Sequence, residues 1–149
     1  MTPWLKLFHL VAAIVWLGGM TFLVYMLRPA AGRLLPPPMR VPLLAGVLGR
    51  FFPAVWVCIA VLLLTGFHTL TQVGMQAAPP SWHVMAAVGV MMSLIFAHLF
   101  FGPYQKLRRA VAAGELEAGG RQLARMHPWV LANLSLGWVA VIAILLLRA

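Results

Sequence analysis

Four long apolar stretches constrain this chain more than any other feature of its sequence. The first, residues 4–27, can cross a bilayer, because about 20 apolar residues in a helix span the hydrocarbon core. Similar stretches follow at about residues 51–73, 82–101 and 128–147. Only 9% of the 149 residues are charged, against roughly a quarter in a soluble domain. The sequence therefore predicts an all-α integral membrane protein, a single domain folded as a four-helix antiparallel bundle.

Loops that contain short local structure are expected between the spans. Residues 28–50 contain the run Pro36, Pro37, Pro38, which we expect to be extended, followed by an interfacial amphipathic segment at 39–52. Residues 102–126 predict two short helices separated by a glycine break. The N-terminus lacks a basic region before its apolar run and a small-residue cleavage site after it, so we expect the first span to be retained.

Basic residues predict the orientation in the membrane. Segments 28–50 and 102–126 carry nine Lys and Arg residues between them, and residues 74–81 carry none. The positive-inside rule then places both termini on the periplasmic side of a bacterial inner membrane. The same rule accounts for the net charge of +9, so nucleic acid is not an expected partner.

The five histidines are predicted to form two layers. His9 lies about 8 Å into the first span, His68 reaches a matching depth in the second, and His83 stands at the entrance of the third. These three form a candidate outer metal site. His98 and His127 form a candidate inner site. Histidines inside a membrane are costly unless they are paired or functional, so this layering predicts a function.

We favour a redox metal centre near the periplasmic face, with a b-type haem between His9 and His68 that serves electron transfer or redox chemistry. His83 could pair with a haem propionate at the rim. Trp16 and Met20 share a helix face with His9, and Gly18 and Gly19 lie beside it; the glycines predict either close helix packing or room for a flat ligand.

Two other interpretations stay open. In one, the outer histidines and several methionines form a copper path without haem, since imidazole and thioether suit Cu(I); the methionines are Met20, Met26, Met85, Met91 and Met92. Cys58 is expected to be an apolar filler, with a soft copper ligand as the alternative. In the other, each histidine bonds a neighbour and the chain is a structural membrane subunit.

The remaining polar residues limit the chemistry. Neither of the two acids lies in a span, which argues against a carboxylate-driven transporter or a membrane hydrolase; whether the chain is an enzyme is left open. Asn133 is expected to bond between helices or to hold a ligand, and Thr65, Thr69 and Thr71 to bond their own helix carbonyls. Expected partners are membrane lipid and a quinone or a periplasmic redox or copper protein; a homo-oligomer is left open.

The chain resembles the CopD-like (copper resistance protein D) membrane family along its whole length. The resemblance is carried by His-x6-Trp-x-Gly-Gly, here His9, Trp16, Gly18 and Gly19, together with GRFFPAVWVCIAVLLLTGFHTL and ANLSLGW. It implies a bacterial inner-membrane protein of copper tolerance or uptake. The first span also resembles the HemJ proteins, which would imply a haem ligand at His9, although TFLVYMLRP after the glycines differs from the HemJ pattern.

Overall fold

The computed structural model describes residues 2–146, and every regular element in that range is a helix. The first long rod consists of α1 (Pro3–Phe22), a π-helical segment η1 (Leu23–Leu27) and α2 (Arg28–Leu34). The second is α3 (Pro37–Val73). The third consists of α4 (Pro80–Leu99), the π-helical η2 (Phe100–Tyr104) and α5 (Gln105–Ala112), and the fourth is α6 (Leu116–Leu146).

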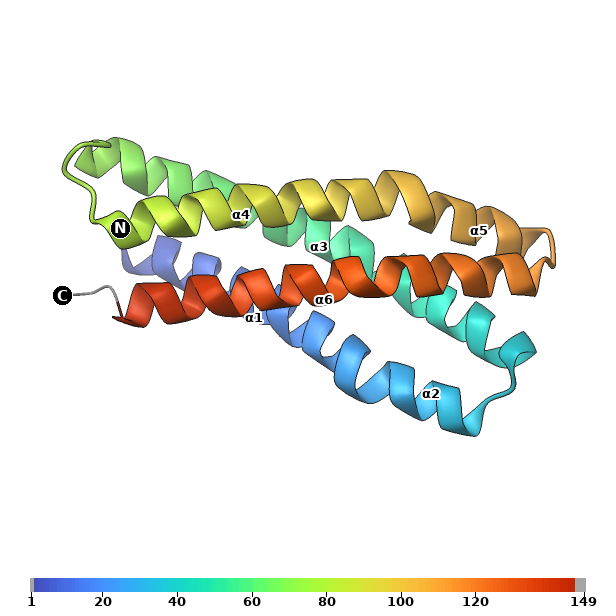
Figure 1. Ribbon diagram of the computed structural model, residues 1–149. Coiled ribbons are helices and arrows are strands. Elements are labelled where there is room, and N and C mark those ends of the chain that lie inside the picture. Colours follow the sequence, from blue (N-terminus) through green and yellow to red (C-terminus); the bar gives the residue numbers. More distant parts are fainter. Residues whose placement is uncertain (1, 147–149) are drawn as a thin grey trace.

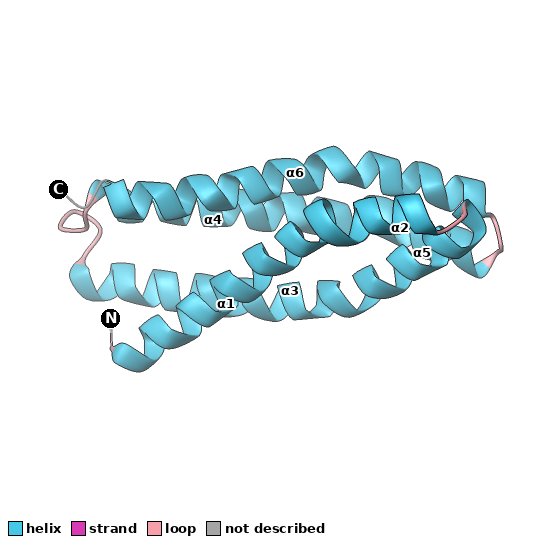
Figure 2. Ribbon diagram, turned by 90° about the horizontal axis from the view of Figure 1, so that it is seen from below, coloured by secondary structure: helices cyan, strands magenta, loops and turns pink. Residues whose placement is uncertain are grey.

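The four rods alternate in direction and form the predicted antiparallel bundle (Figure 1). The chain termini and the connection between α3 and α4 lie together at one end, here called the terminal end. The other end, with α2, α5 and the starts of α3 and α6, is here called the basic end, because it holds the basic residues of segments 28–50 and 102–126. Helix α1 packs mainly on α3, and α4 packs mainly on α6. The α1–α2 rod runs obliquely across α3 (Figure 2).

The helices continue through the two segments that were predicted to be loops. Helix α3 begins at Pro37, so the expected interfacial segment 39–52 is part of a membrane helix. Only Pro36 of the proline run is extended, at φ −65° and ψ 156°. Pro37 and Pro38 occupy the first turn of α3, where a backbone N–H has no helical partner and its absence costs little. Residues 35–36 are all that connect α2 to α3.

Two prolines lie in or near wide helical turns beyond the predicted span ends. Pro29 is the second residue after η1, and Pro103 lies inside η2. In η1 the N–H of Arg28 bonds the carbonyl of Leu23, five residues back. A π-turn of this kind lets a helix continue past a proline, which cannot donate the usual bond four residues back. The first and third rods therefore extend well beyond residues 27 and 101.

The predicted glycine break lies at Gly114, which has φ of +74° and separates α5 from α6. Gly119 and Gly120 do not break the chain, because they lie inside α6. The second short helix of that segment is thus continuous with the fourth span, and Pro128 sits within α6. The predicted end of this span, Leu147, lies outside the described residues.

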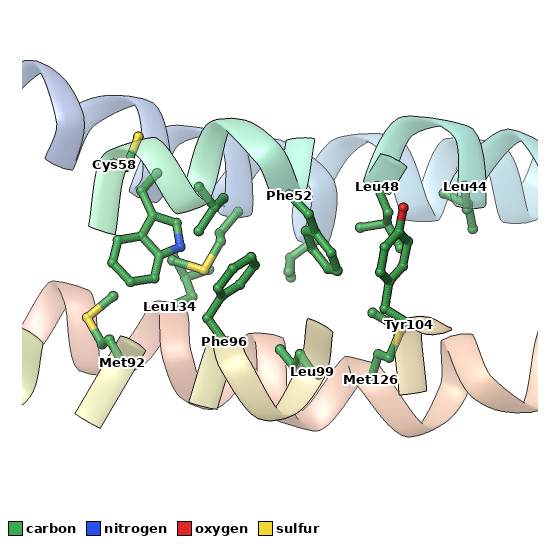
Figure 3. Packing of buried hydrophobic residues seen from close by; sticks show 14 of the residues in the cluster. Leu44, Leu48, Phe52, Cys58, Met92, Phe96, Leu99, Tyr104, Met126 and Leu134 are labelled. Atoms are coloured by element: carbon green, nitrogen blue, oxygen red, sulfur yellow. The ribbon is translucent and has the colours of Figure 1, made fainter. Parts of the chain in front are cut away.

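Aromatic side chains fill the middle of the bundle (Figure 3). Phe52 is 3% exposed and meets Phe96 edge to face at 5.1 Å and Tyr104 at 4.7 Å between ring centroids. Trp56 and Phe100 extend the cluster. Such T-shaped pairs add to the stabilisation that comes from burial, and they bring α3 and α4–η2 together in a fixed register.

The outer surface of the bundle is apolar. Large hydrophobic side chains stand exposed on every rod, for example Trp4 at 70%, Leu64 at 72%, Phe101 at 69% and Leu145 at 62%. Water would be a poor solvent for this surface, and lipid is a good one. Four helices are long and apolar enough to cross a membrane, and the predicted all-α membrane bundle is confirmed.

Candidate functional site

His9 makes a hydrogen bond from one helix to another near the terminal end of the bundle. Its Nδ1 lies 2.6 Å from Oγ1 of Thr65, which joins α1 to α3. Thr65 is 6% exposed and His9 is half-buried, so the bond sits in the contact between the two helices. Gly66 lies beside the imidazole, and a Cβ there would make an ordinary contact of 3.9 Å with Cε1 of His9.

The surroundings of Thr65 fix which nitrogen of His9 carries the proton. The single hydroxyl proton of Thr65 is donated to the carbonyl of Val61, 2.6 Å away on the same helix. Thr65 Oγ1 must then accept its second short bond, and the donor is the Nδ1–H of a neutral His9. The Nε2 atom keeps its lone pair and can bind a metal ion. Histidine ligands in metalloproteins are commonly oriented by such a bond on the other ring nitrogen.

The threonines of α3 behave as the sequence predicted. Besides Thr65, Thr69 donates to the carbonyl of Thr65 at 2.7 Å, and Thr71 donates to that of His68 at 2.8 Å. A hydrogen bond that Thr65 accepts from another helix was not predicted from the sequence. The available signal was that Thr65 lies at the depth of His9 with a glycine next to it.

The other predicted ligands are scattered. His68 and His83 are exposed, and within residues 2–146 no three His, Cys, Asp or Glu side chains gather as a metal-binding group. His98 is exposed and stacks near Trp129, with ring centroids 5.1 Å apart. His127 instead lines a small cavity at the basic end, and His98 is not among the lining residues. The structure thus gives the predicted haem no support.

The residues beside His9 in the sequence have packing roles. Trp16 is 3% exposed and meets Phe96 edge to face at 6.4 Å. At Gly19 an added Cβ would collide with the ring of Phe51, so this glycine permits close contact between α1 and α3. Gly18 is exposed and faces open space. These contacts favour helix packing over room for a flat ligand.

Sulfur atoms are the other soft ligands inside the bundle. Met20, Met92, Met126 and Cys58 are each at most 6% exposed and belong to the hydrophobic core. Cys58 and Met92 lie on one side of the aromatic cluster, and Met126 lies on the other (Figure 3). Of the five methionines that were predicted as possible copper ligands, Met26 and Met91 are exposed. Met126 is buried but was not predicted as a ligand.

The side-chain carbonyl of Asn133 does not make the hydrogen bond between helices that was expected. The side chain is 1% exposed, and its Oδ1 has no hydrogen-bond partner among the described residues. A buried amide oxygen without a donor costs free energy, so this position is a candidate for a functional contact or for stabilisation by substitution.

The fold and its apolar surface define a multi-pass membrane protein with one oriented imidazole between two of its helices. The sequence model of the family described as "Copper resistance protein D" matches residues 45–147, more than two thirds of the chain. The chain belongs to the CopD family, whose name relates it to copper. No curated protein and no solved structure matches the chain. The histidine–tryptophan–glycine motif of the first span lies outside the matched residues.

Proposed function

We propose that the chain handles copper in a bacterial inner membrane and takes the ion from the periplasmic side through Nε2 of His9. The observation that carries the proposal is the 2.6 Å bond between His9 and Thr65, which leaves Nε2 free on a neutral ring. Membership of the CopD family supports copper as the cargo. The clustering of basic residues at one end supports the periplasmic location of the other.

Buried sulfur atoms would carry the ion further. Thioether and thiol sulfur are soft ligands that suit Cu(I), and charged carboxylate ligands are not needed for it. Cys58 and Met92 are placed to receive Cu(I) on the terminal side of the aromatic cluster, and Met126 on its basic side (Figure 3). Phe52 and Phe96 lie between these groups, so passage requires the aromatic side chains to move.

Copper accumulation in cells tests this function. Cells that express His9→Ala should accumulate copper like cells without the protein, because the ion loses its first ligand. His98→Ala is the matched control, since it removes an exposed imidazole at the opposite end. Accumulation should then stay at the wild-type level. If His9→Ala retains wild-type accumulation at equal membrane expression, His9 is not the entry ligand.

A b-type haem on His9 is the second candidate, because an imidazole with a bonded Nδ1–H is the form of histidine that can also bind haem iron. Bound haem would supply one-electron redox chemistry, with a quinone or a periplasmic protein as partner. His68 would be the second ligand, but its side chain is exposed. A reduced-minus-oxidised absorption spectrum of haem-supplied protein tests this. Bands that persist in either His9→Ala or His68→Ala would refute the pair.

A further inference from the structure

A small cavity at the basic end combines an apolar wall with a basic group. It has a volume of about 50 Å³ and lies between η1, α3 and α6. Its apolar wall is formed by Leu23, Val24, Leu44, Leu48, Leu123, Met126 and Val130. Arg28 and His127 contribute its polar side chains. Arg28 follows the apolar stretch 4–27 directly, so the cavity lies where the hydrocarbon core of the membrane gives way to head groups.

The guanidinium of Arg28 has more hydrogen-bond donors than the protein satisfies. Its side chain is partly buried, and among the described residues its one hydrogen bond is from Nη1 to the carbonyl of Leu123 at 3.3 Å. A guanidinium carries five N–H donors in a planar fork that matches carboxylate and phosphate oxygens. A partly buried charge of this kind is costly unless an anion lies beside it.

Within residues 2–146 no acidic group lies beside Arg28. The chain has only two acids: Glu117 pairs with Arg121 at 3.1 Å, and Glu115 is exposed in the turn between α5 and α6. The other polar group of the cavity is the imidazole of His127, which comes from α6. Basic groups from two elements thus line the cavity, and no acid is among the lining residues.

We propose that this cavity binds the phosphate group of an anionic ligand, held by the fork of Arg28 with His127 beside it. The volume is equivalent to a few water molecules, which suits one compact phosphate group and is far too small for a porphyrin. Basic pockets between membrane helices at this depth commonly take phospholipid head groups. An anionic phospholipid and free phosphate share the required chemistry. This proposal is independent of copper binding.

The test uses the full chain, purified in non-ionic detergent and stripped of lipid. Its thermal unfolding midpoint is followed during titration with phosphatidylglycerol, with phosphatidylcholine and with inorganic phosphate against chloride at equal ionic strength. Phosphatidylglycerol should raise the midpoint saturably, and Arg28→Gln should weaken its apparent affinity about tenfold or more, the effect of losing a charge-assisted bond. Arg125→Gln is the matched control, since Arg125 is exposed on the same end of α6 and does not line the cavity.

Each result either distinguishes a phospholipid from free phosphate as the ligand or overturns the proposal. A response to phosphatidylglycerol alone that depends on Arg28 identifies a lipid, and an Arg28-dependent response to inorganic phosphate identifies a free anion. Equal weakening in Arg28→Gln and Arg125→Gln overturns the proposal, because diffuse surface charge would then explain it. The proposal is also overturned if phosphatidylglycerol and phosphatidylcholine change the midpoint equally and inorganic phosphate does not change it. Should Arg28→Gln not fold, His127→Gln allows the same comparison, since His127 is the other polar residue that lines the cavity.

Discussion

Replacing Thr65 with valine tests whether the bond to His9 prepares the imidazole for a metal ion. Valine keeps the branched shape of the side chain and removes only the hydroxyl, so no cavity is created. The Nδ1–H of His9 then loses its acceptor at 2.6 Å, and Thr65 is buried too deeply, at 6% exposure, for water to replace it easily. His9 becomes free to rotate and to adopt the other tautomer, in which Nε2 is protonated and cannot bind the ion.

The expected loss is about tenfold in copper affinity. Removing a partner that orients a metal-binding histidine typically costs roughly 10- to 100-fold, or about 1.4 to 2.8 kcal/mol. An unpaired buried N–H costs a similar amount, about 1 to 3 kcal/mol. We expect the lower end of these ranges, because His9 is only half-buried and solvent or head groups can partly compensate.

Competition with a chromophoric Cu(I) chelator measures the affinity of the purified protein. Nitrogen NMR of labelled histidine should show the Nδ1–H tautomer in the wild type and a mixture in Thr65→Val. Thr65→Ser keeps the hydroxyl and should restore both the wild-type copper affinity and the Nδ1–H tautomer. If Thr65→Val binds copper as the wild type does while His9→Ala does not, the orienting role is refuted. If Thr65→Ser binds copper as weakly as Thr65→Val does, loss of the hydroxyl does not explain the effect, because serine keeps it.

Three further substitutions probe the same framework. Gly19→Ala should lower the free energy of unfolding by about 1 to 3 kcal/mol through collision with Phe51. Gly18→Ala, with open space around it, should raise the free energy of unfolding by up to about 1 kcal/mol; equal effects in detergent unfolding would contradict the packing role. Asn133→Leu should stabilise the fold by about 1 to 3 kcal/mol, because it removes a buried oxygen without a partner, and a fall in the midpoint would mean that the amide is satisfied in the folded protein. His68→Ala should leave Cu(I) affinity unchanged, since its side chain is exposed; a loss measured with the chelator would place His68 at the site.

The histidines show how much of the candidate site could be predicted. Their depth along the spans follows from counting residues, and His9 was singled out on that basis. Which side of the helix a histidine faces depends on its angular position around the helix axis. Depth along the helix does not determine that angle. Thr65 and His68 are three residues apart, about 60° around the helix, yet Thr65 is buried against α1 and His68 is exposed. Matching depth therefore predicted a pair that the structure does not support.

The number of spans and the membrane class were determined by the sequence alone, because hydropathy is summed along the chain and needs no knowledge of packing. The charge bias between the two ends and the family resemblance are likewise properties of the linear order of residues. The tertiary structure decided how far each helix runs, since the first and third rods continue through η1 and η2 beyond residues 27 and 101, where the spans were predicted to end. It also decided the partners of His9 and Arg28, which lie 56 and 95 residues away in the sequence. Contacts at such separations depend on how the helices pack, and no local pattern records them.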